Sequence, residues 1–249
     1  MNEHVPPGTL IRRHGVGTRV WHWVNAVAIF VLIGSGLGIS NAHPRLYWGR
    51  YGANFDHAWL ELPRFPAWIT IPANYNLAIS RRWHLFFALI LGFALLGYMI
   101  WSMVDRHFRR DLTLRRRELT PRHLWTDFKA HLDFRFHDPE APREYNAFQK
   151  LSYIGVLFVA LPLAILTGIA LSPAMNAAWP WVLDVLGGRQ SARSVHFIAS
   201  AAITLFTIVH LVLVILAGVG NEMRSMVTGR WRVPPDGRPD AAADPGVAP

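Results

Sequence analysis

Four histidines of this sequence lie in or beside long apolar segments, where an imidazole ring is energetically unfavourable. Twelve histidines are present, but only four fall in or at the ends of long apolar runs: His22, His84, His196 and His210. An ionisable ring in hydrocarbon is costly unless a ligated metal or a hydrogen-bond partner compensates it, so by default it marks a functional site. Four such rings can ligate a metal centre or line an ion path.

The two histidines of the last apolar run are separated by fourteen residues. At 100° per residue, this separation is within about 40° of a whole number of helical turns, and it corresponds to a rise of about 21 Å. His196 and His210 therefore face the same direction from one helix, at two different depths.

The composition indicates which elements position these rings. Hydrophobic residues make up 52% of the 249 residues and charged residues 16%, which favours an integral membrane protein. We expect the first apolar run to remain as a transmembrane helix, because no short apolar core with a cleavage site precedes it. We predict an all-α integral membrane fold, a four-transmembrane-helix bundle within residues 1–232, with helices near 20–39, 83–104, 151–171 and 195–219. Residues 233–249 are rich in Pro, Ala and Asp and predict a disordered tail.

Positive charge is concentrated in three polar segments: before the first run, after the last run, and in the loop 105–143. With four crossings these segments lie on one side, and the positive-inside rule makes that side cytoplasmic, so we predict cytoplasmic N- and C-termini. The net charge of +9 is then a topology signal, and we expect no nucleic-acid partner. On the other side, segment 40–82 is rich in Trp, Tyr and Pro and suits an ordered cap or docking surface.

This topology pairs the four histidines by depth. The first helix enters from the cytoplasm, which places His22 near the inner surface, whereas the second helix enters from outside and places His84 near the outer surface. We therefore predict an outer pair, His84 with His196, and an inner pair, His22 with His210. The apparent depth of His22 is shallower than that of His210, so helix tilt must absorb the difference.

Two imidazoles at each of two sites are the axial ligands that two b-type haems require. The chain has no cysteine, which excludes covalently attached haem, iron–sulfur clusters and thiolate zinc sites. Glycines let a macrocycle approach the helices, although plain helix packing also uses them: Gly34, Gly36, Gly38, Gly92, Gly155 and Gly168. Arginines near the predicted sites either contact haem propionates or anchor the helices at the membrane interface: Arg19, Arg81, Arg82, Arg189 and Arg193.

Stretches from all four helices resemble the bacterial cytochrome b561 and Ni-Fe-hydrogenase-type di-haem cytochrome b family. These stretches are "RVWHW", "RRWHLFFALILGFALLGY", "EYNAFQKLSYIGVLFVALPLAILTGIALSP" and "SARSVHFIASAAITLFTIVHLVL". Within this family the chain is most similar to the formate dehydrogenase gamma-like cytochrome b subunits of membrane-bound oxidoreductases. The resemblance covers residues 12–232. It implies haem ligation by His22, His84, His196 and His210, in the pairs that the topology gave independently.

The resemblance also implies a function and partners. It predicts a multi-pass protein of the bacterial inner membrane, surrounded by lipid, that transfers electrons between a periplasmic redox protein and the quinone pool. The periplasmic partner would be a molybdopterin oxidoreductase, a hydrogenase-like enzyme or a c-type cytochrome. The chain would be an electron-transfer subunit, with no catalytic residue of its own.

A quinone site is also implied, by the "YNAFQK" stretch before the third helix. In formate-dehydrogenase-type relatives, the quinone lies near an asparagine in such a stretch. Here this carries over to Asn146 and Gln149, with Tyr145 and Lys150 as neighbours. The residues alone favour Asn146 as a helix N-cap, and both roles can coexist.

Three other functions fit parts of the sequence. A self-contained quinone-linked b cytochrome would have the same fold but no dedicated partner. A histidine-based ion or proton transporter would need acidic partners inside the apolar runs, which have no clear Asp or Glu there. A zinc hydrolase is disfavoured because the H-E-x-x-H motif is absent.

Overall fold

The computed structural model describes residues 6, 8–53, 55–104, 120, 125 and 147–233. Among them, four helices are long and apolar enough to cross a membrane: Val16–Ala42, Leu77–Val104, Lys150–Leu171 and Arg189–Leu216. The predicted all-α, four-helix membrane fold is thereby confirmed. The side on which the termini lie stays a prediction.

The observed helices begin before the predicted apolar runs, and the last of them ends at Leu216, before the predicted end at residue 219, because Gly218 starts the separate helix α10 (Val219–Thr228). They are α1 (Val16–Ala42), α2 (Leu77–Val104), α5 (Ala147–Ile154), a π-helical segment (Gly155–Ala160), α6 (Leu161–Leu171) and α9 (Arg189–Leu216). Polar residues such as Arg82 and Arg193 interrupt the hydropathy signal, but arginine is a good helix former and does not interrupt the hydrogen bonding of a helix. The polar first turn of α9 is therefore helical, and α2 continues through Arg81 and Arg82 back to Leu77.

The chain forms two compact units. The bundle unit comprises Trp23–Met99 and Val156–Leu205, and the hairpin unit comprises Met1–His22, Ile100–Gly155 and Phe206–Pro249. The outer histidine pair belongs to the bundle unit and the inner pair to the hairpin unit.

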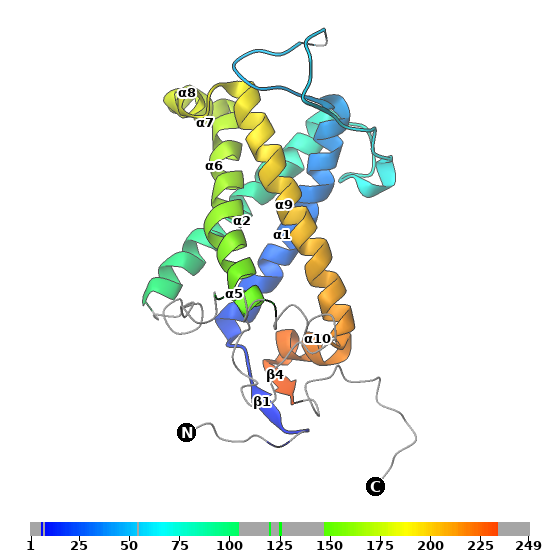
Figure 1. The fold of residues 1–249 in the computed structure, drawn as a ribbon, viewed down its shortest axis with the longest axis vertical. Helices are drawn as coiled ribbons and strands as arrows, with labels where there is room; N and C mark the ends of the chain where they lie inside the picture. Colours follow the sequence, from blue (N-terminus) through cyan, green and yellow to red (C-terminus); the bar gives the residue numbers. More distant parts are fainter. Residues whose placement is uncertain are drawn as a thin grey trace. The chain divides into compact units, whose positions relative to one another are not determined.

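The bundle unit contains most of α1, α2 and α6 and the first part of α9 (Figure 1). Small side chains are buried where these helices meet, as at Ala28, Ser35 and Thr167. This is the packing expected in a membrane, where no hydrophobic effect draws helices together and close backbone approach takes its place.

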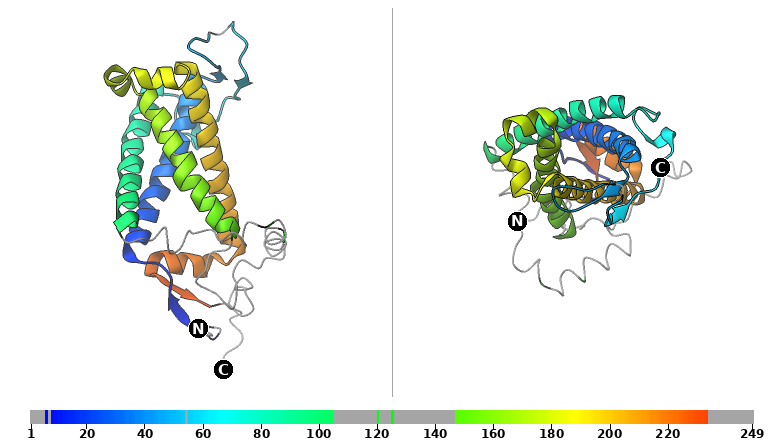
Figure 2. Two further views of the ribbon diagram at one scale, coloured as in Figure 1. Left: turned by 60° about the vertical axis from the view of Figure 1, so that its left-hand side comes forward. Right: turned by 90° about the horizontal axis from the view of Figure 1, so that it is seen from above.

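A cap covers one end of the bundle unit. It consists of the loop 43–76, which holds the paired strands β2 (Arg45–Leu46) and β3 (Leu60–Glu61) and a 3-10 turn at Ala67–Ile69, and of the short helices α7 (Pro173–Ala178) and α8 (Trp181–Val185). Figures 1 and 2 show both parts at the end of the bundle where α9 begins.

Hydrogen bonds fasten the cap loop to the start of α9. The indole Nε1 of Trp59 donates to Ser194 Oγ at 2.8 Å, and Ser194 Oγ donates to the Tyr47 carbonyl at 2.6 Å. The Gly49 amide donates to Ser191 Oγ at 2.7 Å. The expectation of an ordered segment at this end agrees with these contacts, which lie within two turns of His196.

The hairpin unit contains a feature that the sequence patterns did not predict. Strand β1 (Leu10–Arg12) pairs antiparallel with β4 (Arg230–Arg232), and helix α10 (Val219–Thr228) lies beside them (Figure 1). Ile11, Trp231 and Val233 form a small buried core. The predicted disordered tail, residues 233–249, begins one residue too early, because Val233 is buried in this core and its amide donates to the Thr9 carbonyl; residues 234–249 lie outside the described residues.

Candidate functional site

The structure brings the four histidines together as two facing pairs. The ring centroids of His84 on α2 and His196 on α9 lie 6.1 Å apart with an interplanar angle of 71°. Those of His22 on α1 and His210 on α9 lie 6.3 Å apart at 62°. An imidazole nitrogen binds a first-row metal ion at about 2.0–2.1 Å, so two rings facing across one ion have centroids on the order of 6 Å apart. The spacing of both pairs fits one metal ion held between two rings.

Each ring of the outer pair is oriented by a hydroxyl group from another helix. His84 Nδ1 lies 3.0 Å from Ser35 Oγ on α1, and Ser35 Oγ donates to the Val31 carbonyl at 2.7 Å. His196 Nδ1 lies 3.0 Å from both Thr167 Oγ1 and the Ala164 carbonyl on α6. A hydrogen bond at Nδ1 fixes the ring and leaves Nε2 as the nitrogen available to a metal. All four helices of the bundle unit thus contribute to the outer pair.

A glycine follows each of these hydroxyl residues and adjoins the ring that the hydroxyl orients. A Cβ added at Gly36 would lie 3.6 Å from His84 Cε1, and one added at Gly168 would lie 3.4 Å from His196 Cε1. Any larger side chain would therefore occupy the space beside the imidazole. Two other glycines of α1 allow close packing: a Cβ at Gly34 would lie 2.7 Å from Ile71 Cγ1 of the cap loop, and one at Gly38 would lie 2.6 Å from Ser80 Oγ of α2.

The inner pair has an aromatic neighbour. Phe206 lies one helical turn before His210 on α9, and the two rings are stacked, with centroids 5.9 Å apart and an interplanar angle of 12°. Within the described residues, His210 makes ring contacts and no hydrogen bond. The two pairs therefore share a ring spacing but differ in what orients the rings.

The donor set and the space beside it fit a b-type haem. Its macrocycle supplies the remaining iron ligands, so the protein needs to provide only two axial imidazoles. Among the described residues, no group of three or more His, Cys, Asp or Glu side chains could hold a metal ion by itself. Each histidine pair thus resembles an axial ligand pair more than an all-protein metal site.

The five predicted propionate arginines lie near the pairs, but three of them bind main-chain oxygens. Arg193 Nη2 donates to the His43 carbonyl, Arg189 Nη2 to the Leu171 carbonyl at 3.3 Å, and Arg19 Nη1 to the Val227 carbonyl. The other two, Arg81 and Arg82, are exposed in the first turn and a half of α2. A role toward propionates stays a prediction for all five.

His43 lies just beyond the end of α1, and partial burial of its ring lowers its pKa. The positive charges of two of these arginines, Arg193 and Arg81, lower this pKa further. The neutral form of this imidazole is therefore favoured in the folded protein.

The predicted quinone residues are described only in part. Tyr145 and Asn146 lie outside the described residues, and so does the side chain of Gln149, although its backbone is in α5. Lys150 is buried, with 7% of its surface exposed. A buried lysine near the start of the third membrane helix is unusual, because this side chain is almost always exposed unless paired.

Ser35 and Thr167 are the residues that the sequence patterns missed. Each is a small polar residue followed by glycine, in "LIGSG" on α1 and "AILTG" on α6. The same hydroxyl–glycine dipeptide thus occurs on α1 and on α6, the two helices that do not carry His84 or His196. This repetition is the signal that could have identified Ser35 and Thr167. Taken alone, each dipeptide is typical of ordinary membrane-helix packing.

Comparisons with known proteins also point to a b-type cytochrome. Residues 13–229 match the family model described as prokaryotic cytochrome b561. Two proteins named "Probable Ni/Fe-hydrogenase B-type cytochrome subunit" are similar to the chain. The one from Rhodobacter capsulatus is 24% identical over 84% of this chain and 75% of its own length, and the one from Azotobacter vinelandii is 25% identical over 96% and 95%. A protein of Azospira oryzae named as a protein-methionine-sulfoxide reductase subunit is 26% identical over 87% and 96%. No solved structure matches the chain significantly.

Proposed function

This chain belongs to the prokaryotic cytochrome b561 family, and from that premise we propose that it carries electrons across the membrane with two b-type haems. It is a multi-pass protein of the bacterial inner membrane, and the family supports transmembrane electron transfer by a b-type cytochrome. The number of haems, their ligands and the partners are our proposal. His84 and His196 would ligate the outer haem, and His22 and His210 the inner haem.

The observation that carries this proposal is the pair of facing rings in each unit. Ring centroids 6.1 and 6.3 Å apart suit two axial ligands of one iron, and the hydrogen bonds to Nδ1 of His84 and His196 leave Nε2 for that bond. Gly36 and Gly168 keep the space beside the outer rings free of side chains. The haem iron supplies one-electron chemistry when bound. The chain holds the rings, buries them and fixes their orientation.

We propose a redox enzyme as the partner on the side of the outer pair and a quinone on the side of the inner pair. The relatives are named as subunits of a hydrogenase or of a reductase, which supports a redox enzyme. The cap offers it a surface, because the cap loop is fastened to α9 near His196 and exposes Tyr51, Phe55 and Trp68. The quinone residues would be Tyr145, Asn146, Gln149 and Lys150.

A self-contained quinone-linked cytochrome is the alternative that keeps the same fold. Purification of the chain from its native membrane in a mild detergent separates the two. A stoichiometric periplasmic redox enzyme supports our proposal, whereas a quinol-oxidising cytochrome that purifies without a partner supports the alternative.

Electron transfer itself is tested in proteoliposomes. The purified, haem-loaded protein is inserted into vesicles that contain ferricyanide, and a quinol analogue is added outside. We expect the wild-type protein to reduce the enclosed ferricyanide, and either His84→Ala or His22→Ala to abolish this transfer because each removes one of two successive sites. His57→Ala is the matched control, since His57 is exposed in the cap loop. Transfer that persists in both ligand variants would contradict the proposal.

A further inference from the structure

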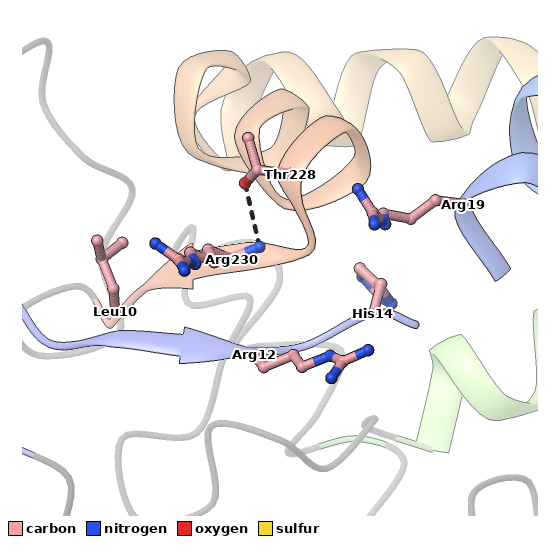
Figure 3. Close-up of a pocket in the computed structure, with 6 residues that line it drawn as sticks. All are labelled: Leu10, Arg12, His14, Arg19, Thr228 and Arg230. Atoms are coloured by element: carbon pink, nitrogen blue, oxygen red, sulfur yellow. Dashed lines mark hydrogen bonds between the residues drawn. The ribbon is translucent and has the colours of Figure 1, made fainter. Parts of the chain in front are cut away.

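A basic pocket in the hairpin unit shares only one of its lining residues, Arg19, with the residues predicted for the haem sites. Its volume is about 490 Å³, and six residues line it: Leu10, Arg12, His14, Arg19, Thr228 and Arg230. Figure 3 shows Arg12 and Arg230 on the two neighbouring strands, with Arg19 reaching from α1 toward α10 and β4. Three elements distant in sequence thus bring three guanidinium groups to one pocket.

The two strand arginines occupy directly opposite backbone positions, although their side chains extend in opposite directions along the strand pair (Figure 3). Arg12 and Arg230 are direct partners in the antiparallel β1–β4 register, and like charges at directly opposite positions destabilise a strand pair. Among the described residues, no acidic side chain pairs with Arg12, Arg19 or Arg230. The nearby carboxylate, Glu222, instead accepts from the Trp231 indole and pairs with Arg13 at 3.8 Å.

Arg19 adds a donor that no described residue uses. Its Nη1 donates to the Val227 carbonyl, which fixes the guanidinium group, whereas its Nε is buried and has no acceptor among the residues that the structure describes. A Cβ added at Gly229 would lie 3.4 Å from that Nε and 2.7 Å from the His14 carbonyl oxygen, and Gly229 has a φ of +80°. A buried donor without an acceptor is unfavourable, so an acceptor from a ligand would stabilise this arrangement.

The scaffold beneath the pocket is closely packed and hydrogen-bonded. Trp231 is fully buried on the other face of the β1–β4 strand pair, and Arg13 Cζ lies 4.7 Å from the centroid of its ring. Asn221 bonds both backbone groups of Arg232, at 2.8 and 2.9 Å. The arginines therefore project from a fixed backbone, which lowers the entropy cost of binding a ligand between them.

We propose that this pocket binds a phosphate group, for which an acidic phospholipid and free inorganic phosphate are the two sources. Guanidinium groups match phosphate oxygens with paired hydrogen bonds, and the negative charge would relieve the repulsion between Arg12 and Arg230. The surroundings favour the lipid, because Leu10 in the pocket lining is exposed, and so are Val16 and Val20 in the first turns of α1, the membrane-spanning helix that carries Arg19. Acyl chains would cover these side chains while the headgroup contacts the arginines.

Binding is measured on the full-length, haem-loaded protein in a nonionic detergent after delipidation. The probes are short-chain phosphatidylglycerol, phosphatidylcholine with the same chains, and inorganic phosphate, titrated by calorimetry. We expect phosphatidylglycerol to bind most tightly, and the double variant Arg12→Gln, Arg230→Gln to weaken it about 30-fold, at roughly five-fold per arginine. Arg224→Gln removes the same charge from an exposed position on α10 outside the pocket, and we expect less than a two-fold change.

The variants also have a signature that does not require a ligand. Without lipid, the double variant should melt at a slightly higher temperature than the wild type, because its strands no longer place like charges opposite each other. Phosphatidylglycerol should raise the melting temperature of the wild type and not that of the double variant.

Each outcome of the binding experiment is decisive. Tight binding of inorganic phosphate that the double variant loses supports the pocket with free phosphate as its source. Equal affinities for the two lipids, or an unchanged affinity in the double variant, would overturn the proposal. The reduced-minus-oxidised haem spectrum is recorded for every variant, and a double variant that loses a haem signal would also overturn it, because the pocket would then serve the inner haem. Failure here leaves the proposed electron transfer standing.

Discussion

The outer and inner histidine pairs reach nearly the same ring spacing by different means. In the bundle unit, hydroxyl and carbonyl oxygens of α1 and α6 hold the Nδ1 atoms of His84 and His196. In the hairpin unit, Phe206 stacks on His210. Two pairs of the same residue type, histidine, can therefore have the same ring spacing while different neighbouring groups orient their rings.

Under the proposed function, this difference bears on electron transfer between the two haems. A hydrogen bond from Nδ1–H to an oxygen makes the imidazole a more basic ligand, which stabilises the oxidised metal. Stacking against an aromatic ring fixes orientation with little effect on ligand basicity. We therefore expect the reduction potential of the outer haem to depend on Ser35 and Thr167, and that of the inner haem to be insensitive to both.

The largest effect is expected from filling the space beside an outer ring. A valine at position 168 would place its Cβ 3.4 Å from His196 Cε1, with two further methyl groups that have no room. Gly168→Val should therefore remove the outer haem and leave the inner haem, which halves the haem content in a pyridine haemochrome assay.

The matched control for this substitution is Gly97→Val. Gly97 also lies within a membrane helix of the bundle unit, but a Cβ there would meet no atom within 4 Å. If both variants lose the same amount of haem, the effect of Gly168→Val is general destabilisation and the glycine is not part of the site.

A smaller effect is expected from removing one hydroxyl group. Thr167→Val keeps the shape of the side chain but deletes the oxygen 3.0 Å from His196 Nδ1. The net value of one hydrogen bond corresponds to about 20–60 mV for a one-electron couple. The outer midpoint potential should rise by this amount in a spectroelectrochemical titration, because the ligand becomes less basic.

Thr204→Val provides the control for the hydroxyl variant. Thr204 Oγ1 donates to the Ser200 carbonyl within α9 at 2.8 Å and makes no hydrogen bond to a histidine of the described residues. A shift of the inner potential in Thr167→Val, or an equal shift of the outer potential in Thr204→Val, would refute the contrast between the two pairs.

The smallest effect concerns the bundle unit alone and depends on pH. The pKa of His43 is lowered by partial burial and by Arg193 and Arg81, so the folded protein resists protonation of this ring. Below pH 6.5 the unfolded chain takes up the proton first, and stability is lost as the pH falls through this range. When the pH is lowered from 7.5 to 5.5, the melting temperature of the wild type should therefore fall by on the order of 1 °C more than that of His43→Gln. A wild type that loses no more than the variant would disprove this account of His43.

The membrane helices and the four histidines that face each other in pairs were predictable because their signals are local. Four apolar runs stand out from the composition, and an imidazole within such a run is rare enough to suggest a function. The helix starts were less predictable, since Arg189 and Arg193 continue α9 beyond the hydropathy signal.

Other features depend on contacts between distant segments and could not be predicted. Ser35 and Thr167 are indistinguishable from packing residues until α1 meets α2 and α6 meets α9. The pairing of β1 with β4 joins three-residue strands from opposite ends of the chain, and such short strands carry no periodic pattern. The basic pocket of the hairpin unit forms only when these strands pair, so it could not be predicted from the sequence either.

The central claim is that each histidine pair holds one b-type haem, and haem stoichiometry tests it most directly. Haem is quantified by the pyridine haemochrome method against protein from amino-acid analysis, in the wild type and in His84→Ala. The account predicts two b-type haems per chain in the wild type and one in the variant, with the remaining haem still low-spin. One haem in the wild type, or two in His84→Ala, would contradict it.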